Sequence, residues 1–173
     1  MNGGITSKMD HARFNHIKAF FLDVDGVLTD GSVLITEQGE LLRTMNVKDG
    51  QAIKFALDAG YFIAIITKGR STGVKDRLLA LGIAHVYDKL SDKVDTISQI
   101  ISEQDFKKEE VLYIGDDIPD LQAKDRVGIF ACPSDAEPEV LTAADYVSHK
   151  KGGQGCVREL IRRVLKIQSK WIY

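Results

Sequence analysis

The stretch FFLDVDGVLTDG, residues 20–31, decides the fold. It begins inside a strand-like apolar run, Lys18–Leu22, that stops at Asp23, and a second carboxylate follows at Asp25 before a glycine. An unbroken apolar strand is typical of a parallel sheet that is buried on both faces. Two carboxylates at the end of such a strand are costly unless a cation or a chemical role compensates for them. The stretch therefore predicts a central strand with charged chemistry at its carboxyl end.

Further apolar runs recur along the chain, and amphipathic segments lie between them. The runs are 61–66, 111–114, 127–131 and 146–147. Helices are expected over Asp49–Ala59, after a cap at Ser71, after a cap at Ser91, and over Gly155–Ile167. This alternation predicts an α/β fold, a Rossmann-like doubly wound parallel sheet with helices on both faces. The segment 32–47 alternates around Gln38 and Gly39 instead, which predicts a projecting β-hairpin.

Length and composition narrow the class of protein. The chain has 173 residues, 44% hydrophobic and 28% charged, which is typical of one globular domain. The net charge of −2 argues against a nucleic-acid partner, and no apolar run is long enough for a membrane span. We expect a flexible N-terminal tail over 1–16 and a single domain over 17–173. Without a signal segment or closely spaced cysteines, the chain is expected in the cytoplasm with Cys132 and Cys156 as free thiols.

Polar side chains follow the expected strands at the point where each ends. Asp23 and Asp25 follow the first expected strand. The second strand is followed by Thr67, Lys68 and Arg70, and the third by Asp116, Asp117 and Asp120. Lys93 lies near the start of an expected helix. In an open parallel sheet the carboxyl ends of the strands meet at one edge, where ligands bind. Clustered carboxylates without paired histidine or cysteine favour Mg²⁺. A hydroxyl and an ammonium facing that metal form a place for a phosphoryl group.

Each of these residues also has a structural interpretation. A lone Asp-x-Asp after a strand is more often a turn or a helix cap, and Asp117 and Asp120 are well placed to cap a helix. A single threonine or lysine is usually a surface residue. The joint occurrence of these groups, each at a predicted strand or helix boundary, favours a functional site over separate structural roles.

The motifs DVDGVLTDG (23–31) and GDDIPD (115–120), together with Thr67 and Lys93, resemble those of the haloacid dehalogenase-like phosphohydrolase superfamily. Within it, the chain resembles the small phosphatases that act on 3-deoxy-D-manno-octulosonate 8-phosphate (KDO 8-phosphate). The motifs that carry this closer resemblance are DGVLTDG (25–31), NVKDG (46–50), SDK (91–93), GDDIPDL (115–121) and KGGQGCVREL (151–160).

The resemblance implies a Mg²⁺-dependent phosphomonoesterase. Asp23 would be the nucleophile that forms an aspartyl-phosphate, and Asp25 the acid and base that serves the leaving group and then water. Thr67 and Lys93 would neutralise the phosphate. The implied metal ligands are the Asp23 carboxylate, the Asp25 backbone carbonyl and the Asp116 carboxylate, with Asp117 and Asp120 behind them.

The substrate is expected to be a small sugar-acid phosphate. Gly26 would leave backbone room for its phosphate, and Arg70 and Lys68 are candidates for binding its carboxylate, although both are also ordinary surface charges. The segment that begins at Thr67 reads TKGR in this chain, whereas the family usually has TGR or TGGR there. The phosphatases of nine-carbon keto-sugar acid 9-phosphates (KDN or N-acylneuraminate) differ in this region and are the alternative. A phospho-accepting receiver domain is a remote alternative, because its motif order is different.

The resemblance also implies an assembly. About 17 residues separate Gly31 from Asp49, enough for a hairpin but not for a cap domain. The family covers its sites as a homotetramer whose hairpins form a barrel, and we expect the same here. Leu34, Leu41, Leu42 and Met45 would then be partly buried between subunits, the alternative being a hairpin folded onto its own domain. The pathway implied is lipopolysaccharide biosynthesis.

Overall fold

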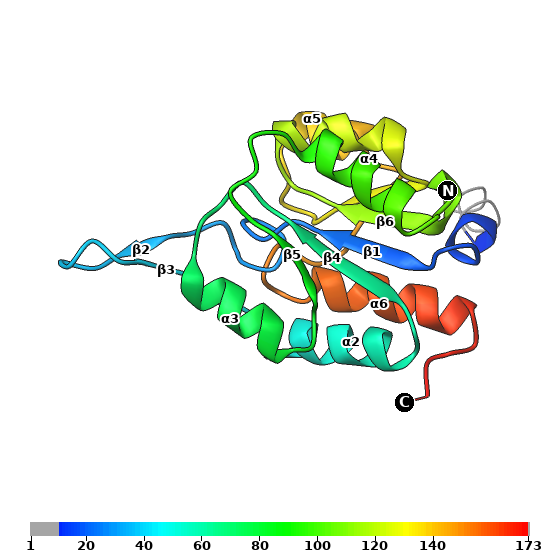
Figure 1. Ribbon diagram of the computed structural model, residues 1–173, viewed down its shortest axis with the longest axis horizontal. Helices are drawn as coiled ribbons and strands as arrows, with labels where there is room; N and C mark the ends of the chain where they lie inside the picture. The colour runs from blue at the N-terminus through cyan, green and yellow to red at the C-terminus, as the bar shows by residue number, and fades with distance from the viewer. Residues whose placement is uncertain (1–10, 173) are drawn as a thin grey trace, which may run out of the picture.

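A parallel six-stranded sheet forms the centre of the computed structural model, which describes residues 11–172 (Figure 1). The strand order is β5-β4-β1-β6-β7-β8, so β1 lies between β4 and β6. The strands are β1 (Ala19–Leu22), β4 (Phe62–Ile66), β5 (His85–Tyr87), β6 (Val111–Ile114), β7 (Ile129–Cys132) and β8 (Tyr146–Val147). The predicted doubly wound α/β fold is therefore confirmed.

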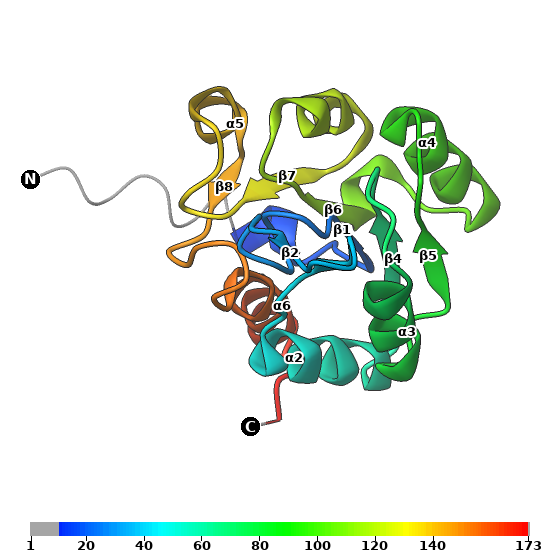
Figure 2. The same ribbon diagram turned by 90° about the vertical axis from the view of Figure 1, so that its left-hand side faces the viewer.

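Helices cover both faces of the sheet (Figure 2). On one face lie α2 (Val47–Asp58), α3 (Thr72–Ala80) and α6 (Cys156–Ile167), and on the other lie α4 (Lys93–Glu103), the 3₁₀ segment η2 (Ile118–Arg126) and α5 (Pro138–Ala143). A short 3₁₀ turn, η1 (Lys108–Glu110), precedes β6. Successive side chains of a strand point to opposite faces, so Phe20 and Leu22 join the core under α2 and α6, while Ala19 and Phe21 join the core under α4.

Local chemistry explains most helix boundaries. The Ser71 hydroxyl accepts a hydrogen bond from the backbone N–H of Val74 at 3.3 Å, as predicted for the start of α3. The predicted cap at Ser91 is wrong by one residue, because the Asp92 carboxylate accepts the N–H of Val94 at 2.7 Å and begins α4. The strand β5 was not predicted from the sequence, since its three residues are only half-buried and carry no periodic signal.

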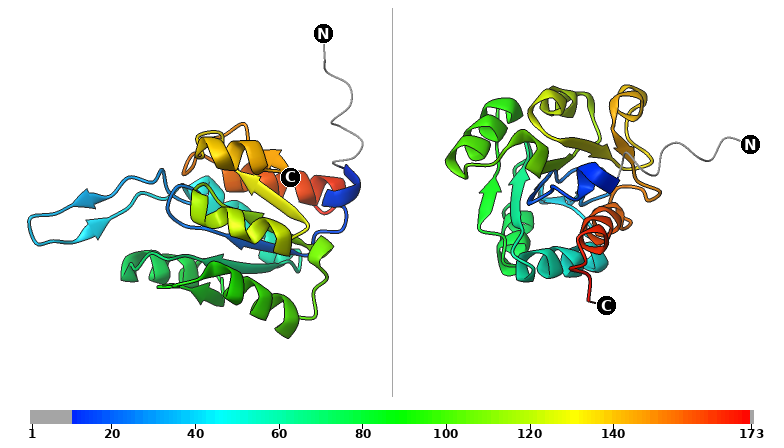
Figure 3. Two further views of the ribbon diagram at one scale, coloured as in Figure 1. Left: turned by 90° about the horizontal axis from the view of Figure 1, so that it is seen from above. Right: turned by 90° about the vertical axis from the view of Figure 1, so that its right-hand side faces the viewer.

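The hairpin breaks away from the sheet at its carboxyl edge (Figure 3). Its strands are β2 (Leu34–Ile35) and β3 (Leu41–Leu42), antiparallel to each other and separate from the main sheet. Leu34 and Ile35 are 66% and 68% exposed, and Leu41 and Leu42 are also exposed. The predicted projecting hairpin is confirmed, and its four strand residues are exposed in the single chain. Met45 at its base packs against the chain's own core instead of being free to lie between subunits.

The beginning of the described chain differs from the expected loose tail. Residues 1–10 of that tail lie outside the described residues, but residues 11–14 form a helical turn. Phe14 in this turn is 1% exposed and packs edge-on against Tyr146. Burial of this aromatic ring holds residues 11–16 against the domain. Within residues 11–172, no helix is long and apolar enough to cross a membrane.

Candidate active site

An acidic cleft of about 290 Å³ lies at the carboxyl ends of the adjacent strands β4, β1 and β6. Every residue that the sequence placed in the site lines this cleft except Arg70. Asp23 and Asp25 follow β1, Thr67 follows β4, and Asp116 follows β6 through a single glycine. The parallel register of the three strands brings these loops to one edge, as the sequence predicted.

Lys93 joins two of the carboxylates. It is the first residue of α4, is 5% exposed, and places its ammonium 2.9 Å from Asp23 Oδ2 and 2.7 Å from Asp120 Oδ1. Burial by itself lowers the pKa of Lys93, but the charges of Asp23 and Asp120 outweigh it and raise the pKa above its ordinary value. The ammonium is therefore a permanent positive charge next to Asp23.

Asp120 anchors this lysine. The Asp120 Oδ1 atom accepts hydrogen bonds from Lys93 and, at 2.5 Å, from the buried hydroxyl of Tyr113. Its Oδ2 atom accepts the backbone N–H groups of Asp116 and Asp117 at 3.0 and 3.2 Å. These four donors use the acceptor capacity of one carboxylate. Asp120 thus holds the lysine and the loop after β6, and it has no lone pair left over for a metal.

The carboxyl groups of Asp23 and Asp116 lie close to each other and to Asp120, and Lys93 only partly offsets their mutual repulsion. Oxygens of Asp23, Asp116 and Asp120 lie within 4.8 Å of one another. Burial, then the charges of Asp23 and Asp120, raise the pKa of Asp116 to about 8. Burial and Asp120 raise the pKa of Asp23 to about 6, although Lys93 acts in the opposite direction. Oxygen donors of the buried Asp23 and the half-buried Asp116, crowded together at one edge of the sheet, fit a hard divalent cation such as Mg²⁺.

Glycine is required where the loops after β1 and β6 meet. Gly26 has a φ of +79°, and a Cβ atom there would lie 1.9 Å from Asp116 Oδ2. Gly115 has the same role on the other strand, because its Cβ would lie 2.4 Å from the Cβ of Asp120. Only residues without a side chain let the carboxylates approach this closely.

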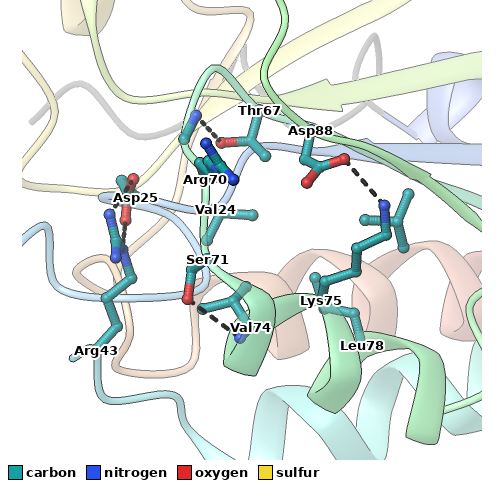
Figure 4. A pocket seen from close by; sticks show the side chains of 12 residues that line it. Val24, Asp25, Arg43, Thr67, Arg70, Ser71, Val74, Lys75, Leu78 and Asp88 are labelled. Atoms are coloured by element: carbon teal, nitrogen blue, oxygen red, sulfur yellow. Dashed lines mark hydrogen bonds and ion pairs between the residues drawn. The ribbon is translucent and has the colours of Figure 1, made fainter. Parts of the chain in front are cut away.

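Asp25 lies between the acidic cleft and a second, narrow cavity of about 20 Å³. Its side chain is 37% exposed, and Asp25, Thr67 and Gly69 line both spaces. In the second cavity its carboxylate faces Arg43, which follows β3 (Figure 4). The Nε atom of Arg43 donates to Asp25 Oδ1 at 2.6 Å, and its Nη2 atom to Asp25 Oδ2 at 3.3 Å.

The remaining predicted residues divide between the two spaces. Lys68 lines the acidic cleft, whereas Arg70 lines the second cavity beside Asp25 and Arg43. The Thr67 hydroxyl is nearly buried and accepts the N–H of Gly69 at 3.1 Å, so its hydrogen is free to donate into the cleft. Asp117 caps η2 through the N–H of Ile118 at 2.7 Å, which is the structural interpretation of that residue.

Two further elements support the site, and sequence reasoning missed the first of them. Arg43 belongs to the hairpin, and no local pattern indicates that it turns back to Asp25. The second support is the turn before α6, where Gly153 donates to the Val27 carbonyl at 2.9 Å and a Cβ on Gly152 would lie 1.9 Å from the Gly26 carbonyl oxygen. This turn lies directly against the loop that carries Asp25, and its glycines were the available signal.

The doubly wound sheet, the acidic cleft and its buried lysine define the class of haloacid dehalogenase-like hydrolases, and the family model of that description matches residues 49–132. The 3-deoxy-D-manno-octulosonate 8-phosphate phosphatase of Salmonella typhi is 39% identical over 155 residues, which cover 90% of this chain and 82% of that protein. The Escherichia coli K12 phosphatase of the same name is 38% identical over 159 residues, covering 92% of this chain and 85% of its own. The chain therefore belongs to the family of 3-deoxy-D-manno-octulosonate 8-phosphate phosphatases.

Solved structures agree with this assignment. The phosphatase of Yersinia pestis superposes with a TM-score of 0.90 at 38% identity, covering 92% of this chain and 86% of that one. The Moraxella catarrhalis phosphatase, described in complex with magnesium, phosphate and KDO, has a TM-score of 0.91 at 31% identity, with 94% of both chains covered.

Proposed function

We propose that the protein is a Mg²⁺-dependent phosphomonoesterase that hydrolyses KDO 8-phosphate to KDO and phosphate through an aspartyl-phosphate on Asp23. One observation carries the proposal. The buried Asp23 carboxylate is held 2.9 Å from the Lys93 ammonium, and the carboxylate of Asp25 lies beside it at the border of a separate cavity. The first carboxylate is placed to attack phosphorus, and the second to serve a leaving group. The family relationship names the substrate.

Both oxygen atoms of the Asp23 carboxylate have a partner. Its Oδ1 atom accepts the backbone N–H of Val24 at 2.7 Å, and its Oδ2 atom pairs with Lys93. An Asp23 oxygen attacks phosphorus, and the bond from phosphorus to the sugar oxygen breaks. Lys93, the Thr67 hydroxyl and backbone N–H groups of the loop at Gly26 bind the phosphate oxygens and stabilise their charge.

Asp25 handles the proton. It donates a proton to the departing sugar oxygen and then takes one from the water that attacks the aspartyl-phosphate, which releases phosphate and restores Asp23. Asp25 lines the acidic cleft and pairs with Arg43, and Arg43 and Arg70 also line an open groove of about 770 Å³ between the hairpin and the start of α3. The phosphate therefore belongs in the acidic cleft and the sugar in this groove. A halide leaving group needs no proton, so an acid at this position favours phosphate esters as substrates.

Mg²⁺ would be held by the carboxylates of Asp23 and Asp116 and the backbone carbonyl of Asp25. When bound, it neutralises charge on the phosphate and on the two carboxylates. Asp120 does not coordinate in this proposal, because its oxygens already accept four hydrogen bonds.

Substrate choice within the sugar-acid phosphates follows from the groove that Arg43 and Arg70 line. Arg70 is proposed to bind the sugar carboxylate there, whereas Lys68 lines the acidic cleft and is better placed for the phosphate. The 9-phosphate of a nine-carbon keto-sugar acid is the second candidate substrate, because the segment TKGR differs from the family pattern.

The working form is proposed to be a cytoplasmic homotetramer in lipopolysaccharide biosynthesis. The exposed Leu34 and Ile35 on the projecting hairpin support assembly through the hairpin, since such ribbons are rarely stable alone. Neighbouring chains would then cover the open cleft. The two cysteines are free and buried, which supports a reducing compartment.

Phosphate release tests the proposal. The purified protein with Mg²⁺ is compared on KDO 8-phosphate and on the 9-phosphates of KDN and N-acetylneuraminate, with KDO 8-phosphate expected to be turned over fastest. Asp23→Asn should remove turnover, while Asp58→Asn, an equal change on the exposed end of α2, should leave it intact. The absence of turnover on every sugar-acid phosphate, or full activity in Asp23→Asn, would contradict the proposal.

A further inference from the structure

The ion pair between Arg43 and Asp25 conflicts with the role of Asp25 as an acid. Both oxygens of the Asp25 carboxylate accept guanidinium N–H groups of Arg43, so the carboxylate is held in this direction and is not turned toward a leaving group. The contact is specific, because the Arg43 side chain is only 8% exposed and its third nitrogen, Nη1, donates to the Leu41 carbonyl at 3.3 Å. Asp25 must leave this fork before it can protonate a leaving group.

The groove between the hairpin and α3 offers a reason for Asp25 to be released. Arg43 and Arg70 line both the narrow second cavity (Figure 4) and this open groove, whereas Lys75 of the second cavity is paired with Asp88 at 3.0 Å. A substrate carboxylate that enters the groove is a competing partner for the Arg43 fork. Such an anion matches the geometry that now holds Asp25.

We propose that Arg43 is a positioning and specificity-determining residue that exchanges one carboxylate for another. In the free protein it holds Asp25, and when a sugar-acid phosphate binds, the guanidinium pairs with the substrate carboxylate and frees Asp25 for proton transfer. A phosphate ester without a carboxylate leaves Asp25 locked. Arg43 therefore selects substrates with a carboxylate not only by binding that carboxylate but also by releasing Asp25 to serve the leaving group. This inference rests on the proposed function and extends it.

Arg43 also links the exchange to the hairpin. It follows β3 directly, so the position of its guanidinium depends on how the returning strand of the hairpin lies. Residues 44–46 then lead straight into α2, where the side chain of Asn46 donates to the Gly153 carbonyl at 3.2 Å and fixes the base of the hairpin. The guanidinium is thus anchored at one end of a projecting element.

The test compares two unactivated phosphate esters that differ in a carboxylate. Arg43→Gln is measured with KDO 8-phosphate and with arabinose 5-phosphate, a sugar phosphate without a carboxylate. On KDO 8-phosphate we expect kcat/KM to fall by about 10- to 100-fold, the usual effect of losing a charge-assisted pair. On arabinose 5-phosphate we expect no loss or a gain of a few-fold, because Asp25 is no longer held. The preference for the acid should therefore fall by at least about 10-fold.

Two variants serve as controls. Arg43→Lys keeps a cation without the fork, so its preference for the acid should lie between those of the wild type and Arg43→Gln. Arg13→Gln breaks an ion pair of similar type, 3.1 Å from Asp145, and should change neither rate. If Arg43→Gln lowers both rates by the same factor, Arg43 has only a structural role. If it lowers neither rate, Arg43 has no role in the reaction. Either result shows that the inference is wrong.

The proposed function and this inference fail differently. A wild type that turns over no sugar-acid phosphate refutes the function. A wild type that turns them over, with an unchanged preference in Arg43→Gln, refutes only the exchange.

Discussion

Gly26→Ala is the substitution whose effect follows most directly from the geometry. The added Cβ would lie 1.9 Å from Asp116 Oδ2, and ordinary contact begins at 3.4 Å, so the carboxylate must move by roughly 1.5 Å. A misplacement of about 1 Å near the reacting atoms costs about 100-fold in rate. We expect kcat/KM to fall at least about 100-fold and the half-saturating Mg²⁺ concentration to rise, because Asp116 no longer faces Asp23.

Gly60→Ala is the matched control. Gly60 has a φ of +84°, close to the +79° of Gly26, but among the described residues beyond its chain neighbours no atom lies within 4 Å of its added Cβ. Both variants should lose about 1–2 kcal/mol of unfolding free energy from the left-handed backbone. Only Gly26→Ala should also lose activity.

The assay combines urea unfolding with phosphate release over a Mg²⁺ titration. Full activity in Gly26→Ala, or an equal loss in Gly60→Ala, would refute the argument that the glycine makes room for the carboxylate.

Three further predictions concern stability, metal binding and assembly. Asp120→Asn should lower the unfolding free energy by about 3 kcal/mol and the rate by at least about 10-fold, because an amide cannot accept from all four donors that meet this side chain; urea unfolding within about 1 kcal/mol of the wild type would contradict this. The pKa of Asp23 is about 6 and that of Asp116 is about 8, both above the ordinary 3.8. The metal-free folded state therefore binds protons more tightly than the unfolded state, and the protein loses stability as pH rises from about 4 to 8. In EDTA, Tm should fall as pH rises over this range, and Mg²⁺ should raise Tm more at pH 8 than at pH 5. If the Mg²⁺ effect is equal at both pH values, or if Tm of Asp116→Asn falls with pH as steeply as that of the wild type, these carboxylates are not the source of the pH dependence. Leu34→Asp should reduce the mass measured by light scattering, since Leu34 is 66% exposed on the hairpin, and an unchanged mass would exclude it from the interface.

The convergence of the site could be predicted from the sequence because it depends on a simple property of the fold. Parallel strands have their carboxyl ends at the same edge, so Asp23, Thr67 and Asp116 had to meet once the strands were recognised. The strands were recognisable because burial on both faces demands unbroken apolar runs. The short edge strand β5 escaped because it is only half-buried.

Roles among similar residues were harder to predict. Asp117 and Asp120 follow the same strand and have the same side chain, yet Asp117 caps η2 and Asp120 binds Lys93. The difference comes from the direction in which each side chain points after the turn at Gly115. Likewise Ser91 and Asp92 are both good caps, and one residue of register decides between them.

The sequence by itself determined the alternating α/β order, the hairpin and the set of charged groups that reach one edge of the sheet, because these depend on local periodicity and on the polarity of parallel strands. Only the tertiary structure decided which charges pair. Arg43 and Asp25 are eighteen residues apart, and their contact at 2.6 Å depends on how a projecting hairpin returns to the domain. An ion pair is set by the positions of two backbones, and that information does not lie in either segment alone.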